Sequence, residues 1–195
     1  MSFRSYKYDA IVLGVSAGGF KTIPLVIKGL KESFRLPVIA VQHSSPDTNL
    51  LVYKNIIEEI SGLTFEIAEE KKHIQPGYFY MAPPNYHLLI EENKTFALNV
   101  DEKVSYARPS IDVLFESAAD VYLNKLIAVV LTGANSDGTE GAKYIKKNGG
   151  IVVVENPETA IADVMPKNVA LNCEIDFQLE AEKFPELLIK LSMEN

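Results

Sequence analysis

Cysteine is almost missing from this chain, and tryptophan is missing altogether: the 195 residues contain one cysteine and no tryptophan. A single cysteine can form no disulfide within the chain and cannot build a cysteine-rich metal site. That residue, Cys173, has no histidine near it in the sequence. We therefore expect no metal, and we expect Cys173 to be buried or incidental rather than a nucleophile.

Clustered positive charge is also lacking. Lysine and arginine number 19 against 26 acidic residues, which gives a formal net charge of -7. Surfaces that bind nucleic acid normally gather lysine and arginine on one face. The lysine pairs at 71–72 and 146–147 are too small for such a face, and we interpret them as solvated. Nucleic acid is therefore not an expected partner.

No apolar run is long enough to cross a membrane. The longest aliphatic stretches, such as Leu126 to Leu131, have the length of a strand. The first nine residues are too polar for a secretory signal. Hydrophobic residues make up 47% of the chain and charged residues 23%, as in ordinary globular proteins. We predict one domain over residues 1–195, cytoplasmic and not inserted into a membrane.

Short apolar runs alternate with amphipathic segments along most of the chain. The pattern predicts strands at 10–13, 36–41, 64–68, 126–131 and 151–154, and helices at 20–30, 50–60, 110–119, 138–147 and 184–193. Pro24 fits the first helix only near its first turn, and Asp47-Thr48 can cap the second. This alternation predicts an α/β fold: a doubly wound, mostly parallel sheet with helices on both faces.

The middle of the chain has a different pattern. Apolar segments at 78–82 and 87–90 flank Pro83-Pro84-Asn85, and a third at 95–100 follows a Glu-Glu-Asn-Lys turn. Short strands joined by turns of this kind indicate antiparallel hairpins rather than crossover units. We expect all three strands to form a small antiparallel insertion.

Three predicted strands are each followed by a residue that can take part in acyl transfer. Ser16 follows the first strand, His43 the second, and Asp137 the strand at 126–131. The carboxyl ends of parallel strands meet at one edge of a sheet, where ligands bind. An imidazole can take the proton of a serine hydroxyl, and a carboxylate can hold that imidazole in the useful tautomer.

Simpler explanations exist for each residue alone. Ser16 stands in a glycine-rich turn, His43 could satisfy a loop carbonyl, and Asp137 could be an N-cap. Together the three favour catalysis. The Gly14-x-Ser16-x-Gly18 turn also matches a strand-to-helix elbow that exposes a nucleophilic serine, and amides at the start of the next helix, including that of Ala17, could stabilise an oxyanion.

Two other functions use the same glycine-rich segment. A dinucleotide-binding turn is disfavoured because Ser16 replaces the central glycine and the second strand ends in Gln42-His43 rather than in an acidic residue. An ordinary α/β-hydrolase is disfavoured because its triad runs serine, acid, histidine along the chain, whereas here His43 precedes Asp137.

Five motifs in one order resemble the catalytic domain of the chemotaxis protein-glutamate methylesterases of the CheB type. They cover most of the chain: Gly14-Val-Ser-Ala-Gly-Gly19, Val41-Gln-His43, Met81-Ala-Pro-Pro-Asn-Tyr-His-Leu88, Arg108-Pro-Ser-Ile-Asp-Val-Leu-Phe115 and Leu131-Thr-Gly-Ala-Asn-Ser-Asp-Gly138.

The resemblance implies a cofactor-free hydrolase of glutamate γ-methyl esters on the cytoplasmic domain of methyl-accepting chemoreceptors, with glutamine deamidation as a second activity. It places the nucleophile at Ser16, the general base at His43 and the orienting acid at Asp137. It also places an oxyanion-hole amide at Ala134, beside that of Ala17. A non-enzymatic receptor-binding scaffold, or an esterase acting on another protein or a small ester, remains an alternative.

Several positions depart from the family pattern. Ala17 replaces a small hydroxyl residue, Ser44-Ser45-Pro46 replaces Met-Pro, and Asn135-Ser136 replaces Gly-Asn. Family members usually also carry a phospho-receiver domain, so phosphorylation control is expected to be absent, to be supplied by a separate receiver protein, or to be missing because the chain is a fragment. Among the other motif residues, we expect a structural hydrogen bond from His87 and a capping role for Ser110, and Arg108 could steer an acidic receptor surface.

Overall fold

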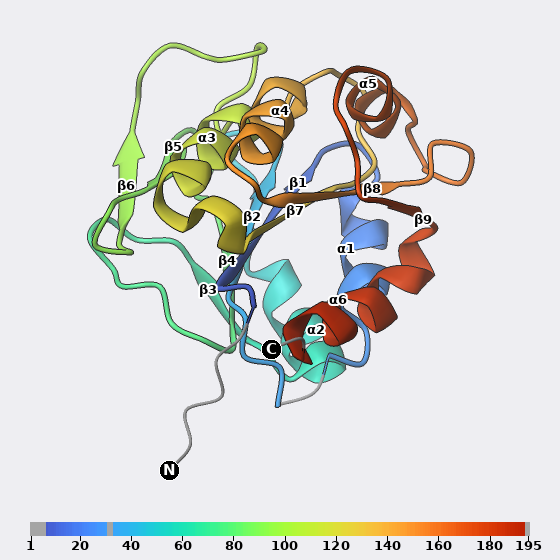
Figure 1. Cartoon of the computed structure of the whole chain (residues 1–195). Helices are drawn as coiled ribbons and strands as arrows, with labels where there is room; N and C mark the ends of the chain where they lie inside the picture. The colour runs from blue at the N-terminus through green and yellow to red at the C-terminus, as the bar shows by residue number, and fades with distance from the viewer. Residues whose placement is uncertain (1–6, 31–32, 194–195) are drawn as a thin grey trace.

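The computed structural model describes residues 7–30 and 33–193 (Figure 1). The first six of the nine residues that argue against a secretory signal lie outside this range. Within the described residues, every helix is too short or too polar to span a bilayer.

Seven parallel strands form the central sheet, in the order β3-β4-β2-β1-β7-β8-β9. Their bounds are β1 Ala10–Val15, β2 Val38–Gln42, β3 Thr64–Ile67, β4 Tyr78–Met81, β7 Leu126–Val130, β8 Ile151–Glu155 and β9 Phe177–Leu179. The strands β5 (His87–Ile90) and β6 (Phe96–Asn99) form a separate antiparallel hairpin. This arrangement confirms the predicted parallel sheet with a small antiparallel insertion.

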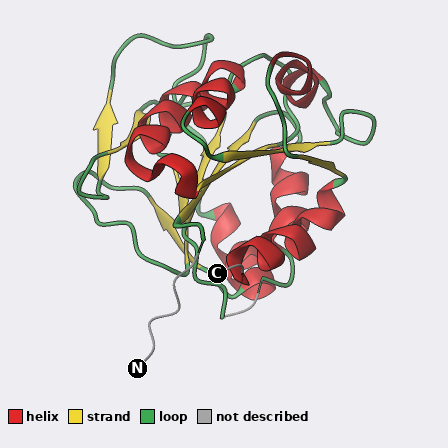
Figure 2. Ribbon diagram, viewed as in Figure 1, coloured by secondary structure: helices red, strands yellow, loops and turns green. Residues whose placement is uncertain are grey.

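Helices cover both faces of the sheet (Figure 2). One face carries α1 (Gly19–Ile27), α2 (Val52–Ser61) and α6 (Phe184–Met193), and the other carries α3 (Ile111–Tyr122), α4 (Thr139–Lys147) and α5 (Val164–Asn172). Two short 3-10 helices, Leu123–Lys125 and Ala181–Lys183, complete the fold. The predicted doubly wound architecture is therefore confirmed.

The strands are buried on both sides because successive side chains point to opposite faces. In β1, Ile11 and Leu13 belong to the core under α1, α2 and α6, whereas Ala10 and Val12 belong to the core under α3, α4 and α5. A strand buried in this way reads as a continuous apolar run rather than as an alternating one.

The expected pairing of residues 78–82 was wrong. The strand β4 is not part of the hairpin but lies in the parallel sheet between β3 and β2. Phe79 and Met81 pack into one core and Tyr80 into the other, so the strand needs cover on both faces, which a surface hairpin cannot give. Residues 68–77 make the crossover from β3 without a helix, and their amides bond the hairpin instead, as Lys71 N–H does to the carbonyl of Phe96 at 2.8 Å.

Other local expectations also need correction. Pro24 is the sixth residue of α1, not a first-turn residue; the bond it cannot donate would reach Phe20, which is 51% exposed, so water can serve that carbonyl. Asp47-Thr48 do not cap α2, which follows Leu51; the amide of Leu51 instead bonds the side chain of Asn49 at 3.0 Å. The helix α5 and the strand β9 were not predicted.

The order in which the chain adds strands to the sheet reverses at β1, although β1 runs parallel to both of its neighbours. From β1 the chain continues to β2 on one side, and it later enters β7 on the other side. Loops that leave neighbouring strands in opposite directions open a crevice at the carboxyl edge of the sheet, the usual place for a ligand in such folds. The segments after β2, β1 and β7 therefore meet at one site.

Candidate active site

The three predicted catalytic side chains form one hydrogen-bonded chain. Nδ1 of His43 lies 3.2 Å from Oγ of Ser16, and Nε2 of the same ring lies 2.7 Å from Oδ2 of Asp137. A carboxylate accepts only, so Nε2 carries the proton that is donated to Asp137. That tautomer leaves a lone pair on Nδ1, where it can accept the proton of the Ser16 hydroxyl.

The turn that carries Ser16 is fixed by glycines and by backbone bonds. Gly18 has φ of 90°, a left-handed conformation that glycine adopts without strain. At Gly19 a Cβ atom would lie 1.9 Å from Oε1 of Gln42, so a larger residue there would have to displace the Gln42 side chain. The amide of Ser16 donates to the carbonyl of Thr132 at 2.9 Å. Together these place Ser16 between β1 and the amino end of α1.

Two neighbouring side chains fix the turns around Ser16 and His43, and motif reading did not assign them a role. Nε2 of Gln42 donates to the carbonyl of Ser16 at 2.9 Å and to that of His43 at 3.1 Å, so one amide links the serine turn to the histidine turn. The hydroxyl of Thr132 donates to the carbonyl of Ala17 at 2.8 Å. Both residues stand at strand ends and inside two of the five motifs, but neither signal indicates which carbonyls they bond.

Asp137 is fully buried and accepts five hydrogen bonds. Its Oδ2 accepts from His43 Nε2 and from the amide of Ile111 at 2.7 Å, and its Oδ1 accepts from Ser110 Oγ, Asp112 N and Gly138 N at 2.9–3.1 Å. Burial alone would raise the pKa of Asp137, but these donors, with the His43 bond foremost, hold the pKa below its ordinary value. Asp137 is therefore a carboxylate at neutral pH.

Asp137 caps a helix, but the helix is α3 rather than α4, which follows Asp137 in the chain. Asp137 bonds the amides of Ile111 and Asp112, the first two residues of α3, although it stands directly before α4. Ser110 is the N-cap residue of α3 by position, yet its hydroxyl makes no capping bond and donates to Asp137 instead. The amino end of α3, which is the positive end of the helix dipole, thus also stabilises the Asp137 carboxylate.

The predicted oxyanion amides belong to two exposed residues in the loops that carry Ser16 and Asp137. Ala17 and Ala134 are both exposed, and within the described part of the chain neither of their N–H groups donates a hydrogen bond. The next amide along, that of Gly133, is already bonded to the carbonyl of Ala162 at 3.0 Å. Both N–H groups are therefore without an acceptor within the described residues, as an oxyanion-binding amide must be.

A cleft of about 450 Å³ adjoins His43. Its walls come from the segments at 43–46 and 103–109, with Asn85 and Asn135 between them. The side chain of Asn135 lies with Nδ2 3.4 Å from Nδ1 of His43, so this departure from the family pattern places a carboxamide at the nitrogen that faces Ser16. The cleft therefore opens beside the His43 end of the hydrogen-bonded chain.

His87 and Arg108 make hydrogen bonds that hold the segments around the site. His87 is buried and bonded at both ring nitrogens, to the carbonyl of Glu102 at 3.0 Å and from the amide of Ser110 at 3.2 Å, as expected. Arg108 uses its guanidinium to hold the cleft wall through Asn85 and the carbonyls at 100–101.

Cys173 is only partly buried. Its pKa is raised by burial, which does not favour a thiolate nucleophile.

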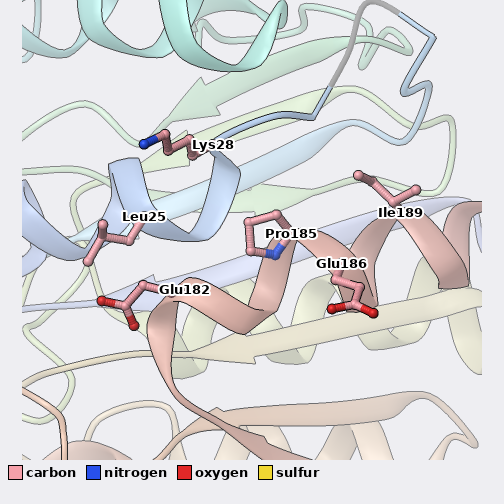
Figure 3. Close-up of a pocket in the computed structure, with 6 residues that line it drawn as sticks. All are labelled: Leu25, Lys28, Glu182, Pro185, Glu186 and Ile189. Atoms are coloured by element: carbon pink, nitrogen blue, oxygen red, sulfur yellow. The ribbon is translucent and has the colours of Figure 1, made fainter.

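The part of the chain that the structure describes contains no metal cluster beside this site, and another groove of the molecule has a different chemistry. No group of three or more His, Cys, Asp or Glu side chains among the described residues is arranged to hold a metal ion. A groove of about 530 Å³ lies between α1 and α6 (Figure 3). Its lining of Leu25, Lys28, Glu182, Pro185, Glu186 and Ile189 contains no nucleophile paired with a base.

Known proteins share both this sequence pattern and this fold. Residues 11–188 match the family model of the CheB methylesterases. A protein of Leptospira interrogans, provisionally named a protein-glutamate methylesterase/protein-glutamine glutaminase, is 46% identical over 189 residues, which is 97% of each chain. The protein-glutamate methylesterase/protein-glutamine glutaminase of Thermotoga maritima is 37% identical over 93% of this chain, but the match covers only 53% of that relative.

The crystal structure of the Thermotoga maritima CheB methylesterase catalytic domain superimposes with a TM-score of 0.87 at 36% identity, covering 94% of this chain and 98% of that one. The family model, the relatives and the solved structure agree with the five-motif resemblance. By sequence and by fold, this chain belongs to the CheB methylesterase family.

Proposed function

We propose that this chain hydrolyses glutamate γ-methyl esters on the cytoplasmic domain of chemoreceptors, in the cytoplasm, with Ser16 as nucleophile, His43 as general base and Asp137 as orienting acid. The observation that carries the proposal is the continuous hydrogen-bonded chain from the hydroxyl of Ser16 through His43 to Asp137. The names of the relatives supply the class of substrate.

In the first half of the reaction, Ser16 Oγ attacks the ester carbonyl while Nδ1 of His43 takes its proton. The resulting imidazolium is stabilised by Asp137 through Nε2–H. The oxyanion accepts hydrogen bonds from the amides of Ala17 and Ala134. When the tetrahedral intermediate collapses, His43 returns the proton to the methoxy oxygen and methanol leaves an acyl-serine.

In the second half, water replaces methanol. His43 takes one proton from the water as it attacks the acyl-serine, and returns that proton to Ser16 Oγ as the glutamic acid side chain is released. The released acid then loses its remaining proton to solvent and becomes the glutamate carboxylate. The same steps with a glutamine side chain would release ammonia in place of methanol, which accounts for a deamidase activity. Every step uses groups of this chain and water.

The proposal is tested by the release of methanol from methylated receptor membranes. Wild type should release methanol, and Ser16→Ala should lower the rate by several orders of magnitude because triad members act as a unit. Near-normal release by Ser16→Ala would contradict the assignment of the nucleophile. A parallel assay with and without an added phosphorylated receiver protein tests whether a separate regulatory partner raises the rate.

The alternative of a non-enzymatic scaffold is distinguished by labelling. A serine-directed phosphonate should modify Ser16, as located by peptide mass spectrometry, and should leave His43→Ala unmodified at the same concentration. A folded wild-type protein that stays unlabelled would support the scaffold. A labelled protein that releases no methanol from receptors would instead indicate an esterase with another substrate.

A further inference from the structure

A second buried carboxyl group lies behind the triad, and the reaction described above does not use it. Asp112 is the second residue of α3 and is 6% exposed. Its Oδ1 accepts the amide of Gly141, the third residue of α4, at 2.7 Å. Asp137, which precedes α4, in turn accepts the amides of Ile111 and Asp112 at the start of α3. The two helices therefore exchange caps.

The exchange brings the two carboxyl groups together in a packed junction. A Cβ atom at Gly141 would lie 2.5 Å from Cβ of Phe115 and 3.1 Å from Cα of Asp112, so the helices are as close as glycine permits. The amide of Asp112 donates to Oδ1 of Asp137 at 3.1 Å, and both side chains are buried, so the two carboxyl groups belong to the same junction. Two carboxyl groups can hydrogen-bond to each other only when one of them carries a proton.

The charges around Asp112 decide which group is protonated. Asp137 faces it from the loop before α4, and Glu116 faces it from one turn along α3, while Glu140 of α4 acts on Glu116. His43 lies on the other side of Asp137 and stabilises that carboxylate. Burial first, and then the negative charge of Asp137, raise the pKa of Asp112 to about 7, although the amide of Gly141 opposes the shift.

We propose that Asp112 is a positioning residue of the triad: as a neutral acid it donates its proton to Asp137 while accepting the Gly141 amide, and as an anion it repels Asp137. The role depends on the function proposed above, since Asp137 acts there as the orienting acid. Ionised Asp112 would displace Asp137 and with it the ring of His43. A displacement of about 1 Å can cost roughly 100-fold in rate. Catalysis should therefore decline as Asp112 ionises.

The decisive variant is Asp112→Asn, which mimics the neutral acid. Its Oδ1 can still accept the Gly141 amide and its Nδ2 can donate to Asp137, but it cannot ionise. The rate of Ser16 labelling by the phosphonate, followed from pH 5 to 10, should fall on the alkaline side in wild type and stay higher in Asp112→Asn. The matched control is Asp120→Asn on the same helix, whose carboxylate bonds Tyr144 and not the triad.

A second measurement does not depend on activity. An acid whose pKa is raised by folding stabilises the folded chain below its ordinary pKa, and that stabilisation is lost as pH rises through the folded value of about 7. The free energy of unfolding of wild type should therefore fall between about pH 4 and pH 7 relative to Asp112→Asn.

The outcomes separate the two proposals. A smaller alkaline loss in Asp112→Asn than in Asp120→Asn, together with the pH-dependent stability difference, is the expected result. Identical labelling profiles for wild type and Asp112→Asn would overturn the positioning role, as would an unchanged stability difference across this pH range. If no form is labelled while the stability difference is present, the serine hydrolase assignment fails and the shared proton stands as a structural feature alone.

Discussion

Asp137→Asn should damage the stability and the chemistry of this protein together. The substitution keeps the size of the side chain but turns one acceptor oxygen into an NH2 group. Oδ2 serves His43 and the amide of Ile111, and Oδ1 serves Ser110, Asp112 and Gly138. Whichever oxygen is replaced, at least one buried backbone N–H then faces a donor instead of an acceptor.

The size of both effects follows from these contacts. A buried amide left without an acceptor lowers the free energy of unfolding by about 1–3 kcal/mol, and the loss is at the upper end when the acceptor was charged. We therefore expect Asp137→Asn to lower the free energy of unfolding by roughly 2–4 kcal/mol. The total free energy of unfolding of a typical domain is about 5–15 kcal/mol. The hydrolysis rate should fall about 10⁴-fold. This is the loss seen in a Ser-His-Asp protease when asparagine replaces the triad aspartate and the histidine takes the wrong tautomer.

Urea unfolding and methanol release, measured on the same preparations, test this prediction. Ser16→Ala is the control, because it removes one partly buried hydroxyl with a single side-chain partner; it should abolish activity and change stability by less than about 0.5 kcal/mol. Equal unfolding midpoints for Asp137→Asn and wild type would refute the capping role. Near-normal hydrolysis by Asp137→Asn would refute the catalytic one.

The effect also has a predicted pH dependence. Folding lowers the pKa of Asp137, so the carboxylate stabilises the folded chain above its ordinary pKa near 4 and this contribution is lost as pH falls through the lower folded value. The stability gap between wild type and Asp137→Asn should therefore narrow below about pH 4.

Two further substitutions test the supports of the serine turn. Thr132→Val keeps the shape of the side chain but removes the hydroxyl that donates to the carbonyl of Ala17. We expect kcat to fall with little change in KM, and the free energy of unfolding to fall by about 1–3 kcal/mol. Thr132→Ser keeps the hydroxyl, so an equal loss of kcat and stability in that variant would contradict this reasoning. Gly19→Ala would force Gln42 away from the carbonyls of Ser16 and His43, so the labelling rate of Ser16 should fall; an unchanged rate would show that Gln42 does not fix the turn.

The sequence was sufficient to predict the parts of the fold that are indicated by the periodicity of apolar residues or by the position of a residue at the end of a strand. Continuous apolar runs marked β1, β2, β7 and β8, because strands covered on both faces leave no polar alternation. Their shared carboxyl edge then predicted that Ser16, His43 and Asp137 would meet, and the structure brings them within hydrogen-bond distance.

Pairing and side-chain partners could not be predicted in the same way. The strand β4 reads like a hairpin strand because its crossover from β3 lacks a helix, and only the packing of Phe79 and Tyr80 into opposite cores shows its place. The helix α5 was missed because Val164 and Leu171 are exposed and its apolar residues do not form a clear stripe. The capping of α3 by Asp137 joins residues about 26 positions apart, beyond the reach of any local pattern.

The position of β1 has a consequence for the newly made chain. The serine and the histidine are 27 residues apart, but the histidine and the aspartate are 94 apart, and they are joined only when β7 pairs on the far side of β1. Closing so long a segment is entropically costly and happens only with extensive non-local pairing. A nascent chain that ends before β7 would hold the serine and the histidine without the aspartate, so the complete triad can form only after β7 has joined the sheet.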